Sequence, residues 1–144
     1  MKKKLTVGVF LILAVVLVAS IVGVGGADAA KPHFVTATVT YMPTGGDNGN
    51  VTIRAAWEKY GPSEVFWWLG EAPKGTTGPH TRVDSGYTDL GGRTASYNDV
   101  VTVKPNLPCD KNYKAYIWLI AKNGRTIKGS YALANLLDVD CPLP

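Results

Sequence analysis

Hydrophobic and polar residues alternate along several short segments of this chain. Between residues 33 and 41, valine, alanine and tyrosine alternate with three threonines. A period of two is typical of a β-strand with one buried face. Comparable alternating or apolar patterns predict strands over residues 51–57, 65–69, 99–104, 113–121 and 126–137.

Residues 70–96 carry a weaker pattern, because glycine, proline, threonine and serine dominate them. Only residues 81–83 and Tyr87 favour short or edge strands there. Turn-forming residues separate the other segments, and no segment has the period of an amphipathic helix. Six or seven short strands without such a helix predict an all-β fold, an antiparallel β-sandwich of about seven strands.

Two motifs resemble the fibronectin type III family. Ile53-x-Ala55-x-Trp57, followed by a polar loop that contains proline, is similar to the second strand of that family, where a tryptophan plugs one end of the core. Leu107-x5-Tyr113, with a proline between the two residues, is similar to the turn and tyrosine corner of the family. In that corner the tyrosine hydroxyl satisfies backbone polar groups.

The resemblance covers about residues 34–137 and implies a fibronectin type III-like sandwich with Trp57, Leu107 and Tyr113 in its core. Two features depart from the family pattern. Val101 and Val103 lie about one residue out of the usual register to Leu107, and Cys109 replaces a typical turn residue. Other immunoglobulin-like sandwiches therefore remain alternatives.

The N-terminal residues 1–29 have the features of a secretory signal peptide. Three lysines precede an apolar run, and a small-residue cleavage site follows it at residues 27–29. The run has about 20 residues, enough to span a bilayer, so an uncleaved membrane anchor is the alternative. Residues 30–144 are then expected to form a single domain.

Removal of residues 1–29 takes away three lysines and one aspartate, so the formal net charge of +4 falls to +2. The remaining cations are scattered among acidic residues rather than gathered in a stripe. Because nucleic-acid binding needs a basic patch on the folded domain, we exclude it.

Cys109 and Cys141 are the two cysteines of the chain, and such a pair in an exported small domain predicts a disulfide. If Asn123-Gly124 forms a hairpin turn, residues whose numbers sum to about 247 face each other. Cys109 would then lie opposite residue 138, three residues from Cys141. The bond would close a loop of about 30 residues and fasten the C-terminal tail.

Residues able to carry catalysis are scarce. The two histidines do not have the ligand spacing of a zinc site, and no serine has the strand–turn–helix setting of a nucleophile elbow. Asp138 and Asp140 are more typical of a solvated edge than of an acid/base pair. We therefore expect no catalytic residue, metal or cofactor. Asn50 begins an N-glycosylation sequon and is a candidate modification site.

The candidate binding residues are aromatic. If the face of residues 113–121 that begins with Tyr113 points to the core, the intervening side chains point outward. At least one of the adjacent tryptophans at 67 and 68 must also face outward. The expected patch is Tyr116, Trp118 and Ile120 together with Trp67 and Trp68. The alternative is that residues 70–96 or the C-terminal tail cover it.

These features predict a secreted or cell-surface, non-enzymatic module that binds another protein or itself, because aromatic residues dominate protein–protein contacts. One alternative is a carbohydrate-binding module whose exposed rings stack on a polysaccharide, although such a platform favours more polar neighbours than Ile120. A second alternative is an inhibitor or receptor-like domain that binds through its loops. Membrane association is expected only if the leader is uncleaved.

Overall fold

The computed structural model of this chain describes residues 34–136 and 138–142. The described residues form seven strands and no helix: β1 (Val35–Gly45), β2 (Asn48–Glu58), β3 (Glu64–Pro73), β4 (Thr81–Asp89), β5 (Ser96–Pro108), β6 (Lys111–Ile120) and β7 (Ala132–Leu136). The predicted leader, residues 1–29, lies outside them. Within the described part, no helix has the length and apolar character needed to cross a membrane.

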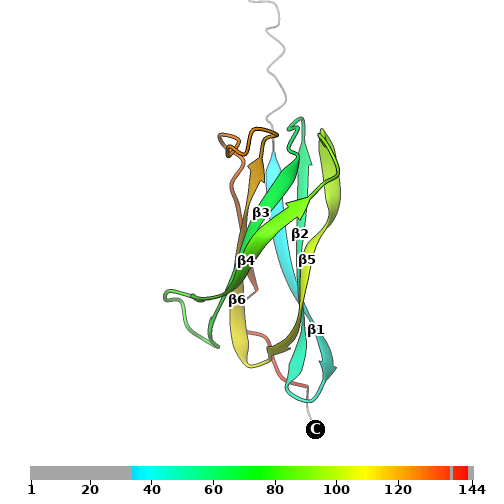
Figure 1. Cartoon of the computed structure of the whole chain (residues 1–144). Helices are drawn as coiled ribbons and strands as arrows, with labels where there is room; N and C mark the ends of the chain where they lie inside the picture. The colour runs from blue at the N-terminus through cyan, green and yellow to red at the C-terminus, as the bar shows by residue number, and fades with distance from the viewer. Residues whose placement is uncertain (1–33, 137, 143–144) are drawn as a thin grey trace, which may run out of the picture. The chain divides into compact units, whose positions relative to one another are not determined.

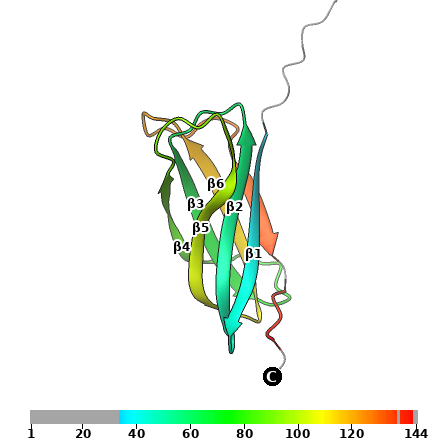
Figure 2. The same cartoon turned by 90° about the vertical axis from the view of Figure 1, so that its right-hand side faces the viewer.

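The seven strands form two antiparallel sheets that face each other (Figures 1 and 2). One sheet has the order β1-β2-β5, and the other has the order β4-β3-β6-β7. The predicted all-β sandwich is therefore confirmed. Every strand pair is antiparallel, so each strand can present one face to the other sheet and one face to solvent.

The core lies between the two sheets and follows the alternation in the sequence. Its largest fully buried side chains on β2, β3 and β6 are Val51, Ile53, Trp57, Val65, Leu69, Tyr113, Ile117 and Leu119. Leu107 is partly buried and packs against this cluster. The expected core positions of Trp57, Leu107 and Tyr113 are confirmed.

Hydrogen bonds satisfy the polar ends of the buried aromatic side chains. The Tyr113 hydroxyl donates to the carbonyl oxygen of Pro108, five residues upstream, at the corner between β5 and β6. The Trp57 indole N–H donates to the carbonyl oxygen of Thr94 at 3.0 Å, and the Trp57 ring stacks on Tyr97. Each ring is thus buried without leaving its donor unpaired.

β5 breaks the simple alternation at Val101 and Val103. The pairing with β2 shifts between Ile53 and Arg54, which leaves Val101 as an extra residue in a β-bulge. Val101 is buried, whereas Val103 is 47% exposed. The predicted strand over residues 99–104 is therefore present but irregular, because the bulge changes which side chain faces the core.

The strands next to β3 and β6 differ from the sequence expectation in extent. The weak hints at 81–83 and Tyr87 belong to one continuous strand, β4, which pairs with β3 along its length. β7 begins at residue 132 rather than 126. Before it, the Ser130 hydroxyl accepts a hydrogen bond from the backbone N–H of Leu119 at 3.1 Å, so a side chain replaces a backbone partner beside β6.

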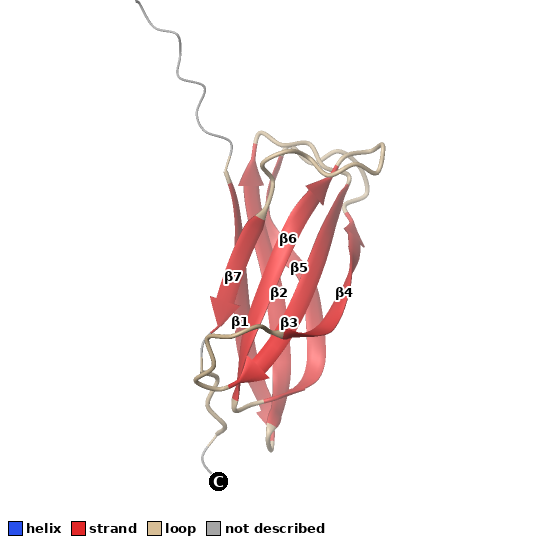
Figure 3. Cartoon of the chain, turned by 90° about the vertical axis from the view of Figure 1, so that its left-hand side faces the viewer, coloured by secondary structure: helices blue, strands red, loops and turns tan. Residues whose placement is uncertain are grey.

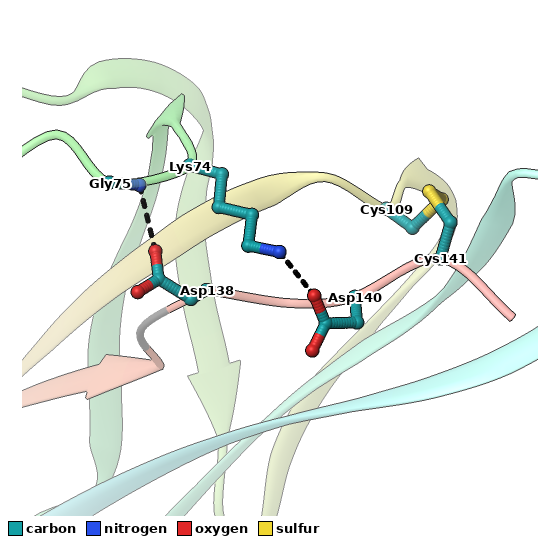
Figure 4. Close-up of polar contacts among 6 residues, drawn as sticks. All are labelled: Lys74, Gly75, Cys109, Asp138, Asp140 and Cys141. Carbon is teal, nitrogen blue, oxygen red and sulfur yellow. Dashed lines mark hydrogen bonds and ion pairs between the residues drawn. A yellow bond between two sulfur atoms is a disulfide. The ribbon is translucent and has the colours of Figure 1, made fainter.

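The predicted disulfide between Cys109 and Cys141 is present, with a Cα–Cα distance of 5.0 Å (Figure 4). The tail before Cys141 also bonds to β6, because the Val139 N–H donates to the Lys111 carbonyl oxygen at 2.9 Å. In this way the tail is fastened beside the start of β6, as the sequence predicts.

Two aspartates of the tail hold the connection between β3 and β4. A carboxylate oxygen of Asp138 accepts from the Gly75 N–H at 2.8 Å, and Asp140 forms an ion pair with Lys74 (Figure 4). Asp138 and Asp140 therefore stabilise this loop.

Candidate functional site

The outer face of the four-stranded sheet gathers aromatic side chains from β3, β4 and β6. Because Val65, Trp67 and Leu69 of β3 face the core, the side chains between them point outward. The same reasoning applies to β6. The resulting aromatic face consists of Phe66, Trp68, Tyr87, Tyr116, Trp118 and Leu133, with Tyr131 at the entry to β7. Figure 3 views the molecule from the side on which β7, β6, β3 and β4 follow one another.

Strand register places these residues in rows across the sheet. Phe66 lies opposite Tyr87 on one side and Trp118 on the other. In the next row, Trp68 lies opposite Ser85 and Tyr116, and Tyr116 lies opposite Leu133. Directly opposed residues in a sheet are close enough for their side chains to touch. The rows therefore form one continuous surface.

The rings contact one another at different angles. Trp68 and Tyr116 stack face to face, with centroids 4.8 Å apart and planes 6° apart. Trp118 meets Tyr116 edge-on at 73° and is tilted by 49° from Tyr131. Phe66 meets Tyr87 at 61°. The surface is therefore ridged rather than flat.

A glycine allows the indole ring of Trp68 to lie against the sheet. A Cβ atom at Gly70 would overlap the six-membered ring of Trp68, so Trp68 leans along β3 over this position. Any larger residue at 70 would push the indole away from the sheet. Gly70 is thus part of the construction of the aromatic face.

Three members of the aromatic face remain strongly exposed. Tyr87 is 64% exposed, Tyr131 is 46% exposed and Leu133 is 45% exposed. Phe66, Trp68, Tyr116 and Trp118 are half-buried, and each contacts at least one other ring of the face. Large contiguous apolar patches on a folded domain mark interaction sites.

Charged side chains border the aromatic face at both of its ends. At one end, Arg82 of β4 and Lys114 of β6 lie on either side of Gly70. At the other end, Glu64 of β3 lies directly opposite Asp89 of β4. Among the described residues none of these four forms an ion pair. The face therefore has a basic end and an acidic end.

The structure brings together three of the five predicted patch residues: Trp68, Tyr116 and Trp118. Trp67 and Ile120 do not belong to the exposed surface, which corrects the expected patch. Trp67 is 7% exposed and belongs to the core cluster, with the Lys104 ammonium 5.6 Å from its ring centroid. Ile120 is 5% exposed and forms an isolated bridge with Thr126.

Four further members of the aromatic face were not among the predicted binding residues. Phe66 follows from the alternation of β3 once Trp67 is assigned to the core. Tyr87 lies on β4, which is too polar to be recognised as a complete strand from the sequence. The direction in which Tyr131 and Leu133 point depends on where β7 begins. That start lies at residue 132, because the Ser130 side chain takes the place of a backbone partner beside β6. The register of the neighbouring strands was needed to find them.

The described residues leave the aromatic face uncovered, although residues 70–96 or the tail were possible covers. Residues 81–89 lie beside β3 as β4 and contribute Tyr87 to the face. The connection between β3 and β4 crosses the end of the sheet (Figure 3), and its Thr76 carbonyl oxygen accepts a hydrogen bond from the Asn112 side-chain N–H at 2.7 Å. This loop therefore contacts β6 at Asn112, two residues before Lys114 and beyond the basic end of the face.

Among the described residues, one group of side chains has the types and spacing that could hold a metal ion. Asp47, Cys109 and Cys141 lie close together, but the disulfide leaves both cysteines without a thiolate to offer. Asn50 lies on β2 opposite Met42 and is partly exposed, so glycosylation there stays a prediction.

The chain was also compared with known proteins. No protein-family model matches the sequence, and no curated protein is a significant match.

Proposed function

We propose that this chain is a secreted or cell-surface, non-enzymatic module that binds a protein through its aromatic face. The single observation that carries this proposal is the uncovered outer face of the four-stranded sheet, with Tyr87, Tyr131 and Leu133 exposed at its margin. Aromatic residues are enriched in protein–protein interfaces, where they supply most of the binding energy. Nothing in the described fold requires rings on a surface that faces solvent.

Several features support the fibronectin type III-like part of the proposal. β4 pairs with β3 rather than with β5, so the edge strand differs from the constant-type immunoglobulin arrangement, in which the fourth strand joins the first sheet. The Tyr113 hydroxyl bonds to the Pro108 carbonyl as in a tyrosine corner. The Cys109–Cys141 disulfide supports export, since disulfides persist in oxidising compartments.

The ring geometry favours a protein over a polysaccharide as the ligand. A sugar platform presents ring faces side by side in one plane, so that successive sugars can stack on them. Here Trp68 and Tyr116 stack on each other, which uses one face of each ring. Trp118 lies edge-on to Tyr116. A ridged apolar surface fits the interlocking side chains of a protein partner better.

The proposal can be tested by site-specific photo-crosslinking of the full-length protein. A photoreactive phenylalanine analogue is placed at Leu133 on the aromatic face, or at Thr38 on the outer face of the other sheet as the matched control. Each variant is irradiated on the producing cells and in their medium. We expect covalent protein adducts from position 133 and none from position 38.

Adducts with this chain or with another protein at position 133 both support the proposal. Equal adducts at both positions, or none at either, would overturn it. A change of tryptophan fluorescence on addition of polysaccharide, without any protein adduct, would favour the carbohydrate alternative. Loss of partner capture after changes in residues 45–50 alone would favour binding through loops.

A further inference from the structure

Resting on the proposed function, we infer that the partner of the aromatic face is a second copy of this chain. The two copies pack face to face about a twofold axis that runs across the strands, so that the strands of one copy are antiparallel to those of the other. The distribution of charge around the aromatic face favours this arrangement.

The charges lie in rows on opposite sides of the aromatic rows. Counting along β3, Glu64 precedes the rows of Phe66 and Trp68, and Gly70 follows them. Asp89 lies beside Glu64, and Arg82 lies beside Gly70. A twofold axis across the strands, between the rows of Phe66 and Trp68, exchanges the two ends. Arg82 of one copy then meets Asp89 of the other, twice in the dimer.

The second face-to-face arrangement is disfavoured by the same charges. With a twofold axis along the strands, each row of one copy faces the same row of the other copy. The acidic end of one copy then meets the acidic end of the other. The basic ends meet in the same way. Like charges brought together at an interface are repulsive and oppose that orientation. Only the antiparallel arrangement brings the basic end of one copy onto the acidic end of the other, with Arg82 facing Asp89.

Like charges within one copy support the same conclusion. Glu64 and Asp89 lie directly opposite each other, and like charges in this position destabilise a sheet. Neither carboxylate has a cationic partner among the described residues. The basic end of a second copy would supply that partner.

The size of the aromatic face limits the strength of the dimer. Four strands about 4.8 Å apart and four rows about 6.8 Å apart define a rectangle of about 500 Å². Two such faces remove about 1,000 Å² from water, which is at the lower end for specific interfaces. We therefore expect a reversible dimer with a dissociation constant in the micromolar range, in which Trp118 is the central apolar contact.

Sedimentation velocity of the full domain, with its disulfide intact, tests the inference through one charge pair. Arg82→Glu and Asp89→Arg each replace attraction by repulsion at both copies of the pair. Each variant alone should dimerise at least about tenfold more weakly than the unmodified protein, because close interfacial charge pairs carry that much coupling. An equimolar mixture of the two variants restores both pairs and should dimerise again.

The matched control is Arg54→Glu, which makes the same change in net charge on the outer face of the three-stranded sheet. It should dimerise like the unmodified protein. Trp118→Ala should raise the dissociation constant about 30-fold, the size expected for an interface hot spot. Circular dichroism of each variant verifies that the β-sandwich is folded.

The outcomes separate this inference from the proposed function. A monomer at all concentrations, combined with adducts to another protein from position 133, would overturn the second copy as partner and keep the protein-binding role. Dimers that Arg82→Glu leaves unchanged would overturn the antiparallel arrangement. Dimers that Trp118→Ala leaves unchanged would place self-association elsewhere on the surface.

Discussion

The two outer faces of this sandwich differ although their inner faces are alike. Both sheets send alternating apolar side chains into one core, as folding requires. The outer face of the three-stranded sheet carries mainly polar residues, Thr36, Thr38, Thr40, Thr52 and Arg54, beside the exposed aliphatic side chains of Met42 and Val103. The outer face of the four-stranded sheet carries the aromatic face. Because the fold accounts for the inner pattern alone, the contrast between the outer patterns is the feature on which the proposed binding role rests.

The largest expected effect on the free energy of unfolding comes from replacing one of two adjacent tryptophans of β3. Trp67→Ala should lower the free energy of unfolding by about 3–5 kcal/mol, because it empties a large volume in the core. Trp68→Ala removes an outer ring and should cost about 1 kcal/mol through its stacking on Tyr116. Urea unfolding at low protein concentration measures both. Equal losses would mean that the aromatic face is part of the folding core.

Removal of the disulfide should have the next largest effect. Replacement of Cys109 and Cys141 by serine should lower the free energy of unfolding by about 3 kcal/mol, by the entropy of closing a loop of this length. The tail also holds the loop around Gly75, so amide exchange there should rise. Unchanged exchange in residues 74–80 would show that the loop below the aromatic face is stable without the tail.

A buried tyrosine allows a test of the core without a large change in volume. Tyr113→Phe removes the donor to the Pro108 carbonyl and should cost about 1–2 kcal/mol at neutral pH. Trp118→Phe is the comparison on the aromatic face, and it should change the free energy of unfolding less. Chemical unfolding of both variants would establish which side of β6 the fold depends on.

The same tyrosine predicts a loss of stability at high pH. Burial raises the pKa of the Tyr113 hydroxyl above its usual value of 10.0, so this group ionises more readily in the unfolded chain. Its contribution is complete below about pH 10 and decreases as the pH rises further. Urea midpoints between pH 8 and 11 should fall at the alkaline end. Tyr113→Phe should weaken this dependence; an identical pH profile would contradict the assignment.

The smallest expected effect is on the polar outer face. Thr38→Ala should change the free energy of unfolding by no more than about 0.5 kcal/mol, because an exposed threonine on a sheet surface has few contacts to lose. Its sedimentation should match that of the unmodified protein. A marked change in association would remove the contrast between the two outer faces.

Much of the fold could be predicted from alternation, because a strand with one buried face has apolar residues at every second position. β6 illustrates this: its inner residues Tyr113 and Ile117 and its outer residues Tyr116 and Trp118 follow the period of two. β4 could not be read in the same way, because it lies at a sheet edge and buries little of its surface. A strand with little buried area needs little apolar sequence.

The candidate site was predicted in part, for a related reason. Alternation assigns faces within one strand, but the neighbours across a face depend on register. The bulge at Val101 and the side-chain hydrogen bond at Ser130 both change register, and the offset of Val101 and Val103 from Leu107 indicates only the first of these in the sequence. Trp67 could not be distinguished from Trp68 by composition, because both sit in a nearly continuous apolar segment. Only the pairing of β3 with its neighbours separates them.

The edges of the four-stranded sheet have a consequence for how far assembly can proceed. Exposed edge strands can recruit further strands and cause open-ended aggregation. Here β7 has five residues, and β4 is interrupted by an extra residue at Val83 and carries Arg82 and Asp84. Neither edge offers a long regular template for another chain. The four-stranded sheet can therefore associate through its outer face without its two edges adding further strands.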